Sequence, residues 1–360
     1  MTTSEIQTLL EKLFTEENSS DIYIIDRIEK QQERFIQFIE KVADDKIKSS
    51  AKGKQTVSKS EVKEKVRKLY KIIIDSIKYY LNGEFETCRK NIYRNFITPE
   101  NVREIKGLMT TSIKNPSKKV YFRIRRNDTY NIYKKKEMFH IPFEKRGVVG
   151  NQRFSVSGYP CLYLGSSIYG CWEETQRPNI DMCNIVALQS TKELKFLSLS
   201  IPTIKNDVGI YANLLYSLVL RLVCSLKAHN ISDNFKQEYI IPQIVLESII
   251  QRNSQSSKVP IDGIKYTSSI YCQPQDMFKD KNLLMNYVLP IRESKEEGLC
   301  PLLTSIFKAT DATSFIAERL KKNVRDTFLH CREEYGNIYD STEFGVLETK
   351  LKNREFFPIE

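Results

Sequence analysis

The sequence has little of what builds metal sites and disulfide scaffolds. Its 360 residues contain three histidines and eight cysteines, and no two cysteines have the CxxC spacing of a zinc or redox pair. Scattered thiols of this kind do not predict a tetrahedral metal site, and they are typical of proteins in a reducing compartment. We therefore expect free cysteines, no bound metal and a cytoplasmic location.

The sequence also lacks a long hydrophobic run. The longest apolar stretch, residues 210–226, contains Arg221 and is shorter than the roughly 20 residues that a membrane-spanning helix needs. The first 21 residues are acidic and amphipathic, unlike a secretory signal peptide. These features predict a soluble protein with no membrane partner, in which residues 210–226 form a buried helix.

Common nucleotide-binding and hydrolytic motifs are absent as well. Neither a GxxxxGK loop nor a GxGxxG loop occurs, and there is no GxSxG nucleophile elbow. His140, His229 and His330 are far apart in the sequence. A serine or cysteine nucleophile needs a base beside it, so the sequence gives no indication of this chemistry.

The basic charge is concentrated in one segment. The net charge is +11, and residues 118–153 hold eleven basic and three acidic side chains, which leaves the rest of the chain close to neutral. Such a segment implies an anionic partner. Nucleic acid bound along a surface and a phosphorylated small molecule bound in a pocket both fit this pattern, as does a solvated basic hairpin.

The periodicity of apolar residues predicts an α+β protein. Long amphipathic runs at the start give way to alternating strands from about Lys118 onwards. Helices are expected at 21–42, 58–81, 84–96, from Pro99, from Ser166, at 210–228 and at 237–250, and strands at 120–126, 153–156, 161–165, 184–188, 194–199, 262–268 and 286–290. The predicted parts are a helical N-terminal domain at 1–115, an α+β domain at 118–310 and a helical C-terminal tail at 311–360.

Five polar residues stand inside apolar strands or at helix starts. They are Arg123, Arg153, Tyr163, Glu174 and Ser268. In this order the surrounding motifs resemble the RES-domain family, whose members are toxins of RES–Xre toxin–antitoxin modules with an ADP-ribosyltransferase-like fold. The matching segments are MFHIPFE at 138–144, residues 150–174, EYIIPQIVLESI at 238–249 and DGIKYTSSI at 262–270. The resemblance covers about residues 118–290.

Two departures from the family pattern leave alternatives open. Thr267 stands where the family commonly has proline, so Ser269 competes with Ser268 for the matched serine. Glu173 neighbours Glu174, and the spacing of eleven residues from Tyr163 is what selects Glu174.

The resemblance implies NAD+ as a substrate, and it assigns substrate contacts. Arg123 and Arg153 would bind the pyrophosphate, since guanidinium groups bind phosphates in a bidentate manner and stay charged. Arg125 shares a strand face with Arg123 and is the reserve. Tyr239 and Gln243, four residues apart on one helix face, are expected to line the pocket.

The remaining matched residues suit cleavage of the nicotinamide–ribose bond. Positive charge develops on the ribose when this bond breaks, and a nearby carboxylate, here Glu174, would stabilise it. Tyr163 would stack on the nicotinamide or bind it through its hydroxyl group. Ser268 would donate a hydrogen bond to the amide or the ribose.

We therefore expect an NAD+-degrading enzyme, a bacterial toxin or defence effector, with water or phosphate as acceptor and no true cofactor. Lys145, Arg146 or Arg125 would supply charge for a second phosphate. The alternatives are a protein ADP-ribosyltransferase and, from another class, a nucleic-acid-binding protein that uses residues 118–153. An Xre-type antitoxin or another regulatory protein is the expected partner. Residues 1–115 are expected to regulate the enzyme or to form a homo-oligomer.

Overall fold

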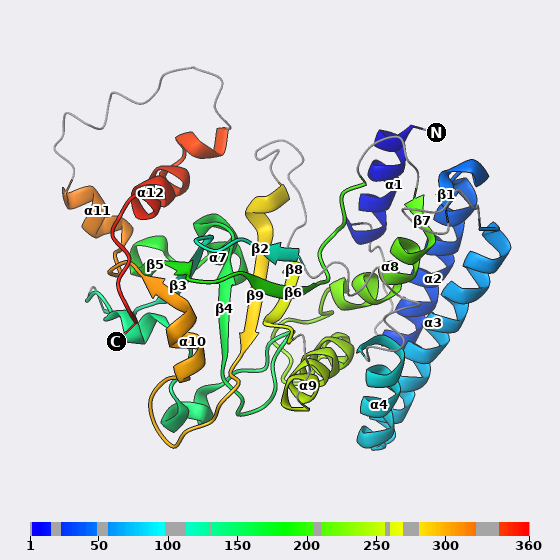
Figure 1. Ribbon diagram of the computed structural model, residues 1–360, viewed down its shortest axis with the longest axis horizontal. Coiled ribbons are helices and arrows are strands. Elements are labelled where there is room, and N and C mark those ends of the chain that lie inside the picture. Colours follow the sequence, from blue (N-terminus) through cyan, green and yellow to red (C-terminus); the bar gives the residue numbers. More distant parts are fainter. Residues whose placement is uncertain are drawn as a thin grey trace. The chain divides into compact units, whose positions relative to one another are not determined.

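The computed structural model describes residues 2–15, 23–48, 57–97, 113–129, 131–204, 210–255, 260–268, 281–321 and 338–359 (Figure 1). The chain divides into two compact units, each made of separate stretches of sequence. The helical unit comprises residues 1–113, 150–156 and 196–264, and the sheet unit comprises residues 114–149, 157–195 and 265–360.

The helical unit is built from amphipathic helices that bury one face against each other. They are α1 (Thr3–Thr15), α2 (Ile24–Lys41), α3 (Lys59–Leu81), α4 (Phe85–Ile92), α8 (Ala212–Ser225) and α9 (Ile240–Ser254), with the helical turns η1 (Asp44–Lys46), η2 (Tyr93–Ile97) and η6 (Gln237–Tyr239) and a parallel pair of short strands, β1 (Ile47–Lys48) and β7 (Ile210–Tyr211). Ser58 and Glu61 form a capping box that starts α3. The two long helices α2 and α3 lie side by side, and α3 also packs against α4 and α8 (Figure 1).

A buried ion pair fastens α2 to the chain between α8 and α9. Arg27 of α2 pairs with Glu238, and neither side chain is more than 5% exposed. Arg27 also donates to the backbone carbonyl of Lys227 at 2.6 Å, and the His229 N–H donates to Glu238 at 2.9 Å. These additional hydrogen bonds offset part of the cost of removing both charges from water. The N-terminal helices therefore hold the connection between α8 and α9.

The sheet unit contains an antiparallel set of strands. Five strands lie wholly within it, in the order β10-β5-β3-β4-β9, namely β3 (Val120–Arg126), β4 (Cys161–Gly165), β5 (Cys183–Ser190), β9 (Met285–Pro290) and β10 (Phe307–Ala309). The strand order continues with β8 (Gly263–Thr267), β6 (Leu194–Ser198) and β2 (Ile113–Asn115), whose residues are divided between the two units. β3 pairs with β5 along its whole length, but with β4 only at Phe122↔Gly165.

Different side chains pack against the two faces of this sheet. The helices and turns of the unit are α7 (Ile168–Glu174), α10 (Pro301–Ile306), α11 (Phe315–Lys321), α12 (Glu343–Lys352), η3 (Lys135–Met138), η4 (Phe143–Val148), η5 (Ile180–Met182), η7 (Lys281–Leu284) and η9 (Ile338–Ser341). Residues of α7, α11 and α12 form one hydrophobic cluster with Phe122 and Ile124 of β3. On the opposite face, the rings of Tyr121, Tyr287 and Phe307 meet edge to face.

The α+β class predicted from the sequence is confirmed, and so are the strand at 120–126 and the helices at 21–42 and 58–81. The strand expected at 153–156 is wrong, because residues 153 and 154 form a turn. The helix expected from Pro99 lies outside the described residues.

The compact units also differ from the three predicted parts of the chain. α8 and α9 group with the N-terminal helices because the apolar faces of α3 and α4 are buried against them. The tail helices α11 and α12 group with the sheet, whose hydrophobic cluster they complete.

Candidate functional site

Arg123 lies where two strands of the sheet separate. β3 and β4 share one registered pair, and next to it the Arg123 guanidinium donates through Nη1 to the backbone carbonyl of Tyr163 at 2.8 Å. The Nε of Arg123 is buried and has no hydrogen-bond partner, and burial lowers the pKa of Arg123 to about 10. A buried cationic donor without an acceptor is destabilising. This guanidinium is therefore suited to bind an anion.

Glu174 is held by an asparagine that the sequence analysis did not single out. The side-chain amide of Asn286 on β9 donates to Glu174 Oε1 at 2.8 Å. The register pairs Gly165 with Asn286 and Tyr163 with Val288, so Tyr163 and Asn286 point to the same face of the sheet. Asn286 is a buried amide near the start of an otherwise apolar strand, and this contrast is the sequence feature that indicates it.

The strand alternation does not place all these side chains on one face. Phe122 pairs with Gly165 and so shares the face of Tyr163 and Asn286. Arg123 therefore leaves β3 on the opposite face, and its hydrogen bond to a carbonyl brings the guanidinium to the edge of β4. Burial raises the pKa of Tyr163 well above its usual value, which keeps the hydroxyl group neutral.

The adjacent carboxylates of α7 have different partners. Glu173 forms an ion pair with Arg177, with 2.9 Å between Oε2 and Nε, and its Oε1 is buried without a hydrogen-bond partner. Glu174 instead contacts Asn286 on β9. Of the two, Glu174 contacts β9, the strand that pairs with the Tyr163 strand β4. This contact supports the choice of Glu174, in addition to its spacing from Tyr163.

The first turn of α7 is fixed against η7. The Ser167 hydroxyl accepts from the Gly170 N–H at 2.8 Å and donates to the Leu283 carbonyl at 2.5 Å. A Cβ on Gly170 would lie 2.5 Å from that carbonyl oxygen, so the close approach requires glycine. Ser268 is buried, and its N–H donates to the carbonyl of Leu284 at 3.0 Å. Ser268 is thus attached to the same segment that anchors α7.

The C-terminal tail supplies a second anchor for α7. Glu348 of α12 accepts a hydrogen bond from the Ile168 N–H at 2.6 Å and another from the Tyr339 hydroxyl. A carboxylate at a helix N-terminus satisfies an unpaired donor and interacts favourably with the helix dipole. Burial raises the pKa of Glu348. The tail, for which the sequence indicated no site residue, therefore positions the helix that carries Glu174.

Three predicted site residues lie together in the helical unit. The Arg153 guanidinium donates through Nη1 to the carbonyls of Cys224 and Leu226, at 3.0 and 2.6 Å, and lies 5.0 Å from the centre of the Tyr239 ring. Gln243 donates to the side chain of Asn151 and to the backbone of residue 152. These contacts make Arg153 an anchor for the end of α8, where backbone carbonyls lack helical partners.

Three cations were expected to supply charge for a second phosphate, and two of them, Arg125 and Arg146, form hydrogen bonds within the sheet unit. Arg125 donates to the Glu137 carbonyl at 2.6 Å and lies over the Tyr133 ring. Arg146 donates to the Gly158 carbonyl at 3.0 Å, whereas Lys145 is exposed. Ser269, the rival to Ser268, lies outside the described residues.

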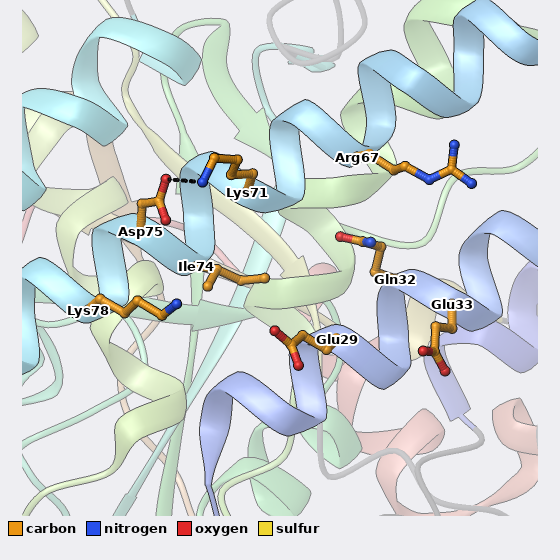
Figure 2. Close-up of a pocket in the computed structure, with 8 residues that line it drawn as sticks. All are labelled: Glu29, Gln32, Glu33, Arg67, Lys71, Ile74, Asp75 and Lys78. Carbon is orange, nitrogen blue, oxygen red and sulfur yellow. Dashed lines mark ion pairs between the residues drawn. The ribbon is translucent and has the colours of Figure 1, made fainter.

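One surface pocket, in the helical unit, is separate from these residues. It has a volume of about 380 Å³ and is lined by residues of α2 and α3 with charges of both signs (Figure 2). Figure 2 shows Lys71 facing Asp75, and these side chains form an ion pair at 3.2 Å. None of the predicted site residues lines this pocket.

In the described parts of the chain, no cluster of histidine, cysteine or acidic side chains is arranged to hold a metal ion. A search of the same residues finds no helix whose length and apolar character would let it cross a membrane.

Comparison with known proteins identifies one relative. A protein of Bacillus subtilis (strain 168) named "Putative toxin YopC" is 31% identical to this chain over 313 residues, which cover 80% of this chain and 68% of that protein. No protein-family profile matches the chain, and no solved structure matches it.

Proposed function

Since this chain belongs to the family of the Bacillus subtilis protein YopC, we propose that it is a toxin that acts by cleaving the nicotinamide–ribose bond of NAD+, with water or phosphate as acceptor. The observation that carries this proposal is the carboxylate of Glu174, held by Asn286 on the sheet face of Tyr163, the residue whose backbone carbonyl accepts a hydrogen bond from the Arg123 guanidinium. The RES-like spacing of these residues supports the same conclusion.

The arrangement suits this reaction step by step. When the bond breaks, its electron pair leaves with nicotinamide and positive charge develops on the ribose. Glu174 would stabilise that charge, because a fixed carboxylate acts most strongly where charge develops in the transition state. Asn286 would keep the carboxylate in place, and Arg123 would bind the pyrophosphate through its Nε donor, which has no hydrogen-bond partner in the protein.

Three arginines of the basic segment make hydrogen bonds within the protein, which weighs against nucleic-acid binding by the whole segment. Residues 118–149 belong to the sheet unit and residues 150–153 to the helical unit. Arg123, Arg146 and Arg153 each donate to backbone carbonyls of their own unit. Proteins that bind a duplex present their cations to the phosphates along one face, whereas these three arginines contact backbone carbonyls of the protein itself.

A toxin that consumes NAD+ also harms the cell that makes it, so the proposal includes a protein that restrains it. The resemblance to RES–Xre modules makes an Xre-type antitoxin the expected partner. Self-association through the helical unit is the alternative means of control.

Nicotinamide release is the direct test. The full-length protein is incubated with NAD+ in buffers with and without inorganic phosphate, and nicotinamide, ADP-ribose and its phosphorylated form are separated by chromatography. The proposal predicts nicotinamide in at least one buffer and much slower release by the Glu174→Gln variant. Intact NAD+ in both buffers would refute the proposal, and a gain in protein mass equal to ADP-ribose would identify protein transfer instead.

A further inference from the structure

The pocket between α2 and α3 is a groove with a row of like charges on each side. Glu29 and Glu33 of α2 form the acidic row, and Arg67 and Lys78 of α3 form the basic row (Figure 2). All four residues are exposed. Among the described residues, no ion pair joins the acidic row to the basic row, although both line the same groove. Opposite charges therefore face solvent on the two sides of one groove.

The two helices are antiparallel, which sets the order of the charges along the groove. Glu40 near the end of α2 forms an ion pair with Lys63 near the start of α3, so the two helices run in opposite directions. Glu29 therefore lies toward the end of the groove that contains Lys78 (Figure 2). The other member of each row lies toward the opposite end.

Apolar surface lies beside the charged rows. Ile74 of α3 lines the groove, and Leu81, seven residues later and so on the same face of the helix, is 39% exposed. The aliphatic stems of the charged side chains extend this surface, because only the ends of these side chains require water. A pair of helices laid along the groove would cover Leu81 and bring its own charges against the two rows.

We infer that this groove binds the same groove of a second copy of the chain, in a dimer with two-fold symmetry. A two-fold axis along the groove places α2 of one copy over α3 of the other. Glu29 then meets the partner subunit's Lys78, Glu33 meets the partner subunit's Arg67, and the symmetry repeats both contacts. A two-fold axis across the groove would place like charges over each other, so the charge pattern selects the first arrangement.

A second copy is the occupant that these charges favour, because the groove is complementary to itself. Any other protein would need a basic row and an acidic row in the matching order. The inference goes beyond the proposed function, since none of the predicted site residues lines the groove. Its test measures mass in solution, and the outcome is therefore independent of whether the protein cleaves NAD+.

Sedimentation equilibrium of the full-length protein measures the association. The wild-type protein should form dimers at low salt, and its dissociation constant should rise with the salt concentration, because salt screens exposed ion pairs. A wild-type protein that stays monomeric at low salt over its whole soluble concentration range overturns the inference and leaves the groove to a different partner.

Two charge-reversed variants identify the surface. Glu29→Lys combined with Glu33→Lys makes the acidic row basic, and Arg67→Glu combined with Lys78→Glu makes the basic row acidic. Each variant alone should dimerise at least about thirtyfold more weakly at low salt, because every substitution turns an attraction into a repulsion in both halves of the interface. An equimolar mixture of the two variants should recover dimerisation, as a mixed dimer with one copy of each.

The matched control is Glu84→Lys combined with Glu86→Lys, which changes the net charge equally at the start of α4, outside the groove. This control should dimerise like the wild-type protein. Circular dichroism checks that each variant folds. If one charge-reversed variant does not fold, Glu29→Gln combined with Glu33→Gln should still weaken the dimer and reduce its salt dependence. A dimer that the groove substitutions do not weaken, or that the control weakens equally, overturns the inference.

Discussion

Replacing Glu174 with glutamine removes a charge while keeping the local structure. The glutamine carbonyl oxygen can still accept the hydrogen bond that Asn286 donates to Glu174 Oε1 at 2.8 Å. The positions of α7 and β9 should therefore be preserved, and NAD+ should bind as it does to the wild-type protein. The variant thus isolates the contribution of the negative charge to the transition state.

The size of the effect follows from electrostatics. Two unit charges about 4 Å apart interact by about 4 kcal/mol at an effective dielectric constant of about 20. If about half a positive charge develops on the ribose, Glu174→Gln raises the barrier by about 2 kcal/mol, which is about a thirtyfold loss of kcat. KM should change little, because the lost interaction is made mainly in the transition state.

The assay is the initial rate of nicotinamide release at several NAD+ concentrations. Glu173→Gln is the matched control, since it makes the same change one residue earlier, where the carboxylate pairs with the largely exposed Arg177. Because Glu173 pairs with Arg177 and Glu174 with Asn286, kcat of the Glu173→Gln variant should stay close to the wild-type value. A severe loss in Glu173→Gln with normal turnover in Glu174→Gln would refute the reasoning.

Three further predictions concern the elements that support the site. Glu348→Gln can keep both hydrogen bonds of the anchor, from Ile168 and Tyr339, whereas Glu348→Ala removes the acceptor of both and should lower the free energy of unfolding in urea by about 2–5 kcal/mol. Because burial raises the pKa of Glu348, protonation stabilises the wild-type protein as the pH falls through the folded pKa. This gain in stability is complete below the pKa that Glu348 has in the unfolded chain, and it is lost as the pH rises through the pKa of Glu348 in the folded protein. Thermal unfolding at a series of pH values should show that the Glu348→Gln variant lacks this pH dependence. Arg27→Met leaves Glu238 buried without its partner and should destabilise the protein by about 3–5 kcal/mol, and the double variant with Glu238→Leu should recover part of the loss if the pair itself is the cause. A chain that starts at residue 115 lacks the helices that cover α8 and α9, so it should aggregate, as measured by size-exclusion chromatography. A folded product that elutes as a single species would contradict this prediction.

The sequence predicted the helices and strands that are determined by the pattern of neighbouring residues. The alternation of VYFRIRR gives β3. The capping serine at position 58 and the helical spacing after it give α3. The helix expected from Ser166 is α7, which begins at Ile168 with Ser167 as its N-cap, while Ser166 donates to the carbonyl of Asn282. Two adjacent serines offer the same chemistry, and only the position of η7 distinguishes them.

The residues that the sequence did not indicate act across long separations in the chain. Asn286 meets Glu174 across 112 residues, and Glu348 meets Ile168 across 180 residues. No periodicity or spacing rule relates such positions, because the contact depends on strand order and helix packing. A buried amide in an apolar strand is at least unusual enough to be noticed, whereas a glutamate in an amphipathic tail helix is not.

The helical unit is more than an addition to the sheet unit. Arg153, Tyr239 and Gln243 all lie in it, although they fall within the segment that resembles RES domains. Arg153 binds the carbonyls at the end of α8, and Arg27 of α2 holds the chain that follows that end. The N-terminal helices therefore support the very segment that carries these residues. If these helices also regulate the protein, as expected from the sequence, they would act by shifting their packing against α8 and α9. Removing them altogether would expose the buried faces of α8 and α9.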